Sequence, residues 1–507
     1  MGNVKKDTLR ITLISYVGLG LGYLNKAFLF IILLTTQEIG IINLLITSGL
    51  FFAQLSNLGA IYVTWRFFPF FRDEGKKNYG FLLLNFLIVT CGSLFFTLLF
   101  FLLKAPINAY FMDKSPLFVT YAWWVVPVGI GHVFFLLFEN YMRGLFKNVL
   151  PVFMQDIVLR LLTTLLLVLY ALKIFSFELF LVLLMLSNLI PALVLCIYLI
   201  KKKEFYFSLK SITIPKRFRS IILHFSLFSY VNTLATIIVV TMDAVMIGGM
   251  IGLAAVGIYT SMVQITSAML LPFRAMTRVS SPIVAKLWKE KNIPGLQAIY
   301  QKSSGVGLFI GLSSFLMLWL PVKELFSFIK PEFQTGIPVL FFLLIGRLVD
   351  MYCGLNGVIF ATSKKYKYDL VFTVFLCFGI YGLNYFLIKG GYGISGVGFA
   401  TGVIYVCYNL ARSIFIYWAY GLNPLHWRQL LLFLNALLVI AAVEILRLWF
   451  PFHEHATTFE QMVRLGIIES LVALGFFLPV IWFRLEPDVA DYTKRLLRSL
   501  FYKRVKL

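Results

Sequence analysis

The chain has 507 residues, of which 60% are hydrophobic and only 13% are charged, and its formal net charge at pH 7 is +23. A water-soluble globular chain of this length would not tolerate so much apolar side chain on its surface, so this composition excludes a soluble protein. It predicts an integral membrane protein.

Membrane-spanning helices are expected along nearly the whole chain. About 20 residues at 1.5 Å each cross a hydrocarbon core of about 30 Å, and the apolar runs here are continuous, without the two-residue alternation of lipid-facing strands. We therefore expect an all-α protein with about fourteen transmembrane helices. In chain order the expected spans are Leu9–Leu34, Ile39–Thr64, Tyr79–Leu103, Leu117–Met142, Pro151–Leu172, Ser176–Ile200, Ile221–Gly248, Ala255–Ala275, Gly305–Pro321, Gly336–Ala361, Leu370–Ile388, Ser395–Trp418, Leu430–Phe450 and Leu465–Phe483.

The basic residues predict the orientation of these helices. Lys and Arg gather in every second connection, as in segment 201–219 and in the tail from Arg484 to Lys506, whereas the opposite connections hold only a handful, such as Lys104. This is the positive-inside bias, and it stays in phase along the chain. We therefore expect both termini in the cytoplasm. The net charge needs no nucleic acid to explain it, because basic segments lie against anionic membrane lipids.

Two halves of the chain are similar in sequence pattern. The letters "SYV" occur at Ser15 and again at Ser229, and "GIINLL" at Gly40 corresponds to "GIYTSM" at Gly257. With equal helix numbers, these matches predict two pseudo-symmetric six-helix bundles, residues 1–210 and 211–425, related as a parallel repeat. Residues 426–484 would add two further transmembrane helices, and residues 485–507 a basic cytoplasmic tail.

Nothing in the sequence points to catalysis. No connection is long enough to fold into a catalytic domain, and we find no phosphate-binding loop, dinucleotide fingerprint or nucleophile elbow. The five cysteines lack paired spacing, and the cluster "HEH" at His453–His455 offers fewer ligands than the three or four that zinc needs. We therefore expect a transporter, not an enzyme, with no metal site and no cofactor other than a coupling ion.

Four stretches carry a resemblance to a known family. They are "QEIGIINLL" after the first span, "MRGLFKNVLP" and "FATSKKYKYDL" at the inner ends of the fourth and tenth spans, and "GGYGISGVGFATG" before the twelfth. Over roughly residues 9–420, the chain resembles the polysaccharide (O-antigen, Wzx-type) flippases of the multidrug, oligosaccharidyl-lipid and polysaccharide (MOP) exporter superfamily.

The resemblance implies a fold, a function and a place. It implies a MOP-type exporter fold that works by alternating access in the bacterial cytoplasmic (inner) membrane. The implied function is the transfer of undecaprenyl-diphosphate-linked oligosaccharide from the cytoplasmic to the periplasmic leaflet, for cell-surface polysaccharide synthesis. The partners it implies are that glycan, membrane lipids, a glycan polymerase and glycosyltransferases.

Lys26 is the first candidate for substrate binding. It lies well past the middle of the first span, and that span supplies no acid three or four residues away. A diphosphate in a cavity of low dielectric must meet fixed cations, so an unpaired lysine predicts an anion contact. Arg66 and Arg274 fall at positions where related peptidoglycan-precursor flippases hold a diphosphate, and Arg278 follows four residues later. These three arginines are near expected inner ends, so anchoring of the topology is an equally good account of them.

Asp243 is a lone carboxylate in the seventh span. With Asn384 and Thr401 it offers oxygen ligands for Na+, and similar positions form a sodium site in some peptidoglycan-precursor flippases. Where those proteins carry a further carboxylate, this chain has Ile388. A proton carrier, or a carboxylate in reach of interfacial water, is the other interpretation of Asp243.

Three charge pairs are spaced to share a helix face: Glu139 with Arg143, Asp156 with Arg160, and Arg347 with Asp350. Self-neutralised structural ion pairs are the favoured interpretation, because paired charges are how such groups are tolerated in membranes.

The glycines near the twelfth span indicate a turn and a close contact. Gly390, Gly391 and Gly393 fall in a turn that needs positive φ, and Gly398 and Gly402 share one helix face, where they would let another helix approach.

Three alternative functions follow from the same pattern. A cation-coupled multidrug exporter would share the twelve-helix core but needs neither the two extra helices nor a cationic lumen, and a peptidoglycan-precursor flippase would differ in its glycan. A membrane glycosyltransferase or glycan polymerase would need a carboxylate cluster in a sizeable external loop, and the sequence has none.

Overall fold

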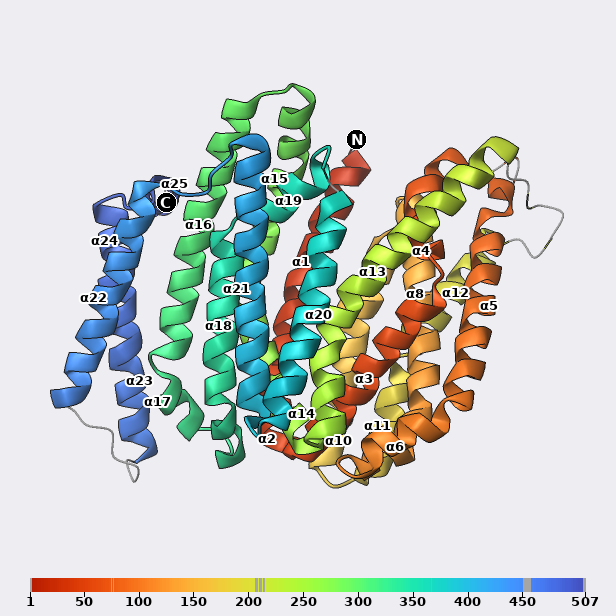
Figure 1. Ribbon diagram of the computed structural model, residues 1–507, viewed down its shortest axis with the longest axis horizontal. Coiled ribbons are helices and arrows are strands. Elements are labelled where there is room, and N and C mark those ends of the chain that lie inside the picture. Colours follow the sequence, from red (N-terminus) through yellow and green to blue (C-terminus); the bar gives the residue numbers. More distant parts are fainter. Residues whose placement is uncertain are drawn as a thin grey trace. The chain divides into compact units, whose positions relative to one another are not determined.

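The computed structural model describes residues 2–73, 75, 77–205, 208, 212, 215–365, 367–449 and 457–504. Within these residues every regular element is helical. They form two compact units, residues 1–261 and 262–507. Within each unit, most long helices run roughly parallel or antiparallel to one another (Figure 1).

The protein is a multi-pass membrane protein, as its hydropathy predicts. Thirteen helices among the described residues are each long and apolar enough to cross a membrane, and a broken span made of α14 and α15 brings the number to fourteen. The prediction of about fourteen spans in an all-α protein is therefore confirmed.

The first unit is built from α1 to α14. Their bounds are α1 Gly2–Tyr23, η1 Leu24–Leu29, α2 Phe30–Leu33, α3 Thr36–Ser56, α4 Ala60–Phe67, η2 Phe68–Phe70, η3 Lys77–Gly80, α5 Phe81–Leu102, α6 Lys104–Met112, α7 Pro116–Tyr121, η4 Ala122–Trp124, α8 Val125–Gly144, α9 Val149–Phe153, η5 Met154–Val158, α10 Leu159–Ala171, α11 Phe177–Ser187, α12 Ile190–Lys201, α13 Lys216–Met250 and α14 Leu253–Ser267, which runs past the unit's boundary.

Helix α8 lies at the centre of the first unit and packs against α3, α4, α5 and α12. Local sequence fixes where the surrounding helices start: Thr35 and Glu38 form a capping box at the start of α3, and Gly59 takes a left-handed conformation, with φ of 82°, directly before α4. The buried core here is rich in aromatic rings, and the tilted rings of Phe68 and Tyr141 have centroids 4.4 Å apart.

The seventh span, α13, belongs to this first unit. It packs against α3 and α4, and the hydroxyl of Tyr230 donates to the carbonyl oxygen of Leu55 at 2.8 Å. Ser115 likewise donates to the carbonyl oxygen of Gly248 at 2.6 Å. The units divide at residue 261 and not at 210, so the expected division into two six-helix bundles stays a prediction.

The second unit is built from α15 to α25. Their bounds are α15 Leu270–Lys289, α16 Ile293–Trp319, α17 Val322–Ser327, η7 Pro331–Gly336, α18 Ile337–Tyr352, α19 Asn356–Thr362, α20 Lys367–Lys389, α21 Gly393–Tyr420, α22 Trp427–Trp449, α23 Thr458–Val472, η8 Ala473–Phe477, α24 Leu478–Trp482 and α25 Pro487–Arg504.

Helices α18 and α21 make the tightest contact in the second unit, and glycine permits it. A Cβ at Gly398 would come within 2.8 Å of the Val339 Cα, and one at Gly402 within 2.5 Å of the Phe342 carbonyl oxygen. The close approach expected for these two glycines is therefore confirmed. Gly391 and Gly393 have φ values of 83° and 55° in the preceding turn, as expected, whereas Gly390 is not among the residues of positive φ.

The two helices expected after the repeat are α22 and the span formed by α23, η8 and α24 (blue in Figure 1). They pack against each other and against α16. A second capping box, made by Thr457 and Glu460, starts α23.

Candidate functional site

Lys26 lies on a turn of π-helix. The first span runs as α1, changes to π-helical geometry over Leu24–Leu29, and returns to α-helix as α2. Single π-helical turns inside α-helices occur often at functional sites. The Lys26 side chain is exposed, and the described residues bring no carboxylate into ion-pair distance of it. The charge that acts on it most strongly is the like charge of Arg160.

A polar seam joins the first span to the fifth, next to Lys26. The Asn25 amide donates to the carbonyl oxygen of Arg160 at 2.8 Å, and the Thr164 hydroxyl donates to the Asn25 side-chain oxygen at 2.7 Å. Further along, Ser15 donates to Asp156 at 3.0 Å, and the Arg160 guanidinium donates to the carbonyl oxygen of Gly18. These bonds fix the rotation of the first span and so the direction of its π-helical turn.

The other three candidate cations are exposed side chains on two different elements. Arg66 lies near the end of α4, where its guanidinium stands 4.4 Å from the centre of the Phe225 ring. Arg274 and Arg278 are four residues apart on α15, and the charge of Arg274 acts on Asp350. Lys26 and Arg66 belong to the first unit, and Arg274 and Arg278 to the second.

Two of the three expected charge pairs come together. Arg143 lies 2.8 Å from Glu139, and Arg160 lies 3.1 Å from Asp156. Asp156 and Arg160 also bond to Ser15 and Gly18 of the first span, so this pair connects two spans and does not only neutralise one helix face.

Arg347 and Asp350 are not within ion-pair distance of each other. The Arg347 guanidinium lies 5.2 Å from the centre of the Tyr405 ring, a cation–π contact. Asp350 receives a hydrogen bond from Asn409, and the charges of Arg347 and Arg412 oppose its own.

A charge pair that the sequence analysis missed joins the buried Arg412 of α21 to the half-buried Asp369 of α20. Arg412, only 7% exposed, stands 2.7 Å from Asp369 and lies over the rings of Tyr408 and Phe360. Together with Asp350, it makes a network of charges inside the second unit. Arg412 and Asp369 are 43 residues apart, so no spacing rule within one helix could pair them.

Asp243 is a buried carboxylate on α13, and the hydroxyl of Tyr259 on α14 donates to it. Asn384 on α20 and Thr401 on α21 are buried as well, in the second unit. All three side chains are therefore shielded from solvent. The cluster His453–His455 lies outside the described residues.

Comparisons with known proteins show which solved structures have this architecture. No family model matches the chain, and no curated protein matches it. Among solved structures, the chain is similar to the lipid II flippase MurJ in an inward-closed conformation, with a TM-score of 0.69, 14% identity, and coverage of 93% of this chain and 99% of that one.

Two further solved structures show the same architecture. One is an inward-facing MATE-family multidrug transporter of the MOP superfamily, with a TM-score of 0.63, 16% identity, and coverage of 82% and 98% of the two chains. The other is a MOP-superfamily transporter from Pyrococcus furiosus, with a TM-score of 0.51, 16% identity, and coverage of 82% and 96%. The fold expected from the sequence, that of a MOP-type exporter, is therefore confirmed.

Proposed function

We propose that the protein is a flippase for lipid-linked oligosaccharide. In this proposal it moves undecaprenyl-diphosphate-linked glycan from the cytoplasmic to the periplasmic leaflet of a bacterial inner membrane, by alternating access and with both termini cytoplasmic. The glycan headgroup crosses through the protein while the polyprenyl chain stays in lipid, because enclosing a long alkyl chain in a polar lumen would forfeit its favourable solvation.

The observation that carries the proposal is Lys26. A fixed cation inside a span is costly unless it meets a counter-charge, and among the described residues no carboxylate is within ion-pair distance of it. Lys26 stands on a π-helical turn that the seam residues Asn25 and Thr164 hold in place. A substrate diphosphate supplies the missing negative charge. Arg66, Arg274 and Arg278 are proposed as the further cations that the substrate meets.

Asp243 is proposed as the coupling group, with Asn384 and Thr401 as additional oxygen ligands. Its burial and its bond from Tyr259 support a carboxylate that binds Na+ or takes up H+ during the cycle. If Asp243 couples transport, Asp243→Asn will remove the dependence of export on the sodium or proton gradient. An unaltered gradient dependence would exclude Asp243 from coupling.

A test of the flippase uses a strain that lacks the protein. We expect lipid-linked glycan to accumulate on the cytoplasmic side and to be exported again when the wild-type chain is restored. Lys26→Gln should abolish export at an unchanged protein level, and Lys26→Arg should retain part of it because the charge is kept. Lys323→Gln is the matched control, since Lys323 is an exposed lysine outside all the sites named above.

The outcomes separate the proposal from its alternatives. Full export by Lys26→Gln would remove Lys26 from substrate binding. Accumulation of the peptidoglycan precursor alone would identify a precursor flippase, and drug sensitivity with normal glycan export would identify a multidrug exporter. In vesicles that contain the purified chain alone, glycan synthesis instead of transfer would identify an enzyme.

A further inference from the structure

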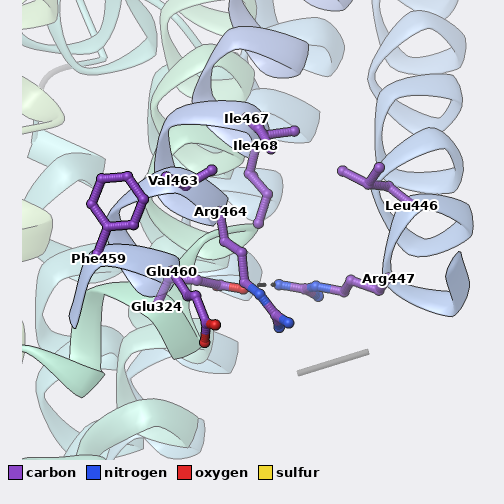
Figure 2. A pocket seen from close by; sticks show the side chains of 9 residues that line it. All are labelled: Glu324, Leu446, Arg447, Phe459, Glu460, Val463, Arg464, Ile467 and Ile468. Atoms are coloured by element: carbon purple, nitrogen blue, oxygen red, sulfur yellow. Dashed lines mark ion pairs between the residues drawn. The ribbon is translucent and has the colours of Figure 1, made fainter. Parts of the chain in front are cut away.

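A second candidate binding site lies in the two helices added after the expected repeat. A cavity of about 290 Å³ opens among α17, α22 and α23. None of the substrate or coupling candidates lines it. Its lining residues are Glu324, Leu446, Arg447, Phe459, Glu460, Val463, Arg464, Ile467 and Ile468 (Figure 2).

The cavity combines an apolar wall with four charges that sum to zero. Leu446 on α22 and Val463, Ile467 and Ile468 on α23 line the apolar side. The charged side consists of two arginines and two glutamates, and the ion pair between Glu324 and Arg447 is drawn as a dashed line in Figure 2. A purely anionic or purely cationic ligand would lie beside a like charge here, whereas a ligand that carries both signs can place each of its charges beside an opposite one.

Glu324 leaves one acceptor without a donor. The side chain is only 3% exposed, and its Oε2 atom accepts no hydrogen bond from any described residue. Arg447 stands 3.7 Å from this oxygen, while its Nη1 lies 2.7 Å from Glu444. A buried carboxylate oxygen that lacks a donor is unfavourable, so a ligand that brings an N–H group to it is stabilised in the cavity.

We propose that this cavity binds the headgroup of a zwitterionic glycerophospholipid that carries a primary ammonium, such as phosphatidylethanolamine. Arg447 and Arg464 receive the phosphate, and the ammonium donates to Glu324 and Glu460. A volume of about 290 Å³ is near the lower limit of ligand pockets, about 300 Å³. The cavity therefore holds the headgroup, and the acyl chains run along the apolar residues into the bilayer.

The position of the cavity agrees with a lipid headgroup. It lies where α22 approaches its end at Trp449 and where α23 has just begun at Thr458. Ends of membrane-spanning helices lie at the level of the lipid headgroups. The expected topology puts this end at the outer face, where arginines are against the general charge bias. The inference concerns a resident lipid and does not depend on the transported substrate.

The experiment compares the binding of three lipids to the purified full-length protein. The protein is transferred into nanodiscs that contain equal fractions of phosphatidylethanolamine, phosphatidylcholine and phosphatidylglycerol, and the retained lipid is identified by native mass spectrometry. We expect selective retention of phosphatidylethanolamine, because a quaternary ammonium has no N–H to donate and phosphatidylglycerol has no cation. Phosphatidylethanolamine should raise the melting temperature more than the other two lipids do, and inorganic phosphate should not raise it.

Two variants test the residues. Arg464→Gln should weaken phosphatidylethanolamine binding at least tenfold, and Lys323→Gln, which removes a neighbouring exposed cation outside the cavity, should leave it unchanged. Equal retention of the three lipids by the wild-type chain, or equal binding by Arg464→Gln, would overturn the proposal. Full stabilisation by inorganic phosphate alone would also overturn it, in favour of a free-anion site. The wild-type lipid comparison decides the matter even if Arg464→Gln does not fold.

Discussion

The C-terminal helix α25 is docked through a carboxyl group whose protonation should control the docking. Glu486, 6% exposed, directly precedes α25, and its carboxyl group packs against Gly305 of α16. Burial, aided by the charge of Asp488, raises the pKa of Glu486 to about 7, while Arg428 and Lys302 act in the opposite direction. Raising the pH from 4.5 through about 7 therefore weakens this contact.

The sign and size of the effect follow from the two states of Glu486. Its ordinary pKa is 4.5, so the docked state holds the proton more tightly than the undocked state does. Below pH 4.5 both states are protonated and docking carries no penalty. As the pH rises from 4.5 to about 7, the docked state loses stability relative to the undocked state. The pKa difference of about 2.5 between the two states corresponds to a loss of about 3 kcal/mol in the free energy of docking. The exposed ion pair of Lys302 and Asp488 offsets less than about 1 kcal/mol of this.

Hydrogen exchange of the α25 amides measures the docking. We expect protection at pH 5.5 to exceed that at pH 8 by roughly thirtyfold, after correction for intrinsic rates. Glu486→Gln should remove the pH dependence and keep α25 docked. Gly305→Ala should weaken the docking of α25 at both pH values because its methyl group would force the Glu486 carboxyl group to move, whereas Gly466→Ala, with no atom near its Cβ, should change nothing. Equal protection of the wild-type helix at both pH values would refute this reasoning.

Two further predictions concern stability in detergent, measured as melting temperature and extent of unfolding. Gly40→Ala should destabilise the first unit by about 1–3 kcal/mol, because its methyl group would collide with a backbone carbonyl of α14, while Gly20→Ala, with open space around its Cβ, should be neutral or slightly stabilising. Arg412→Gln should cost about 3 kcal/mol because it leaves the half-buried Asp369 without its counter-charge, and adding Asp369→Asn should restore much of the loss. Arg143→Gln, at an ion pair whose arginine side chain is 46% exposed, should cost under about 1 kcal/mol; a cost equal to that of Arg412→Gln would contradict the role of burial.

The spans could be predicted from the sequence because the bilayer imposes them. Backbone groups must be satisfied within each helix, and a run of about 20 apolar residues has few alternatives in lipid. The same physics made the contact at Gly398 and Gly402 predictable, since small residues four apart on one face favour close helix packing. The span expected at Ala255–Ala275 is present, but its break between α14 and α15 gave no such signal, and α15, which is rich in basic residues, continues well beyond Ala275.

The partners of the charged residues could not be predicted in the same way. Pairs within one helix, such as Asp156 with Arg160, follow from spacing alone. Asp369 and Arg412 lie on different helices, and their pairing depends on how each helix is rotated about its axis, which hydropathy does not specify. Helix rotation also accounts for the contact of Arg347. Its spacing predicts an ion pair with Asp350, but its guanidinium lies over the ring of Tyr405.

The first span shows what specifies a helix partner in this protein. Apolar burial contributes little to the choice, because only 22% of its most apolar window is buried and lipid solvates apolar side chains as well as protein does. The contacts that distinguish one rotation from another are polar: Ser15 with Asp156 and Asn25 with Thr164, more than 130 residues apart along the chain. A change of one residue in register would break both bonds inside the membrane, where no water replaces them. The apolar composition thus determines which segments lie in the membrane, whereas the orientation of Lys26 depends on a few polar side chains of the fifth span.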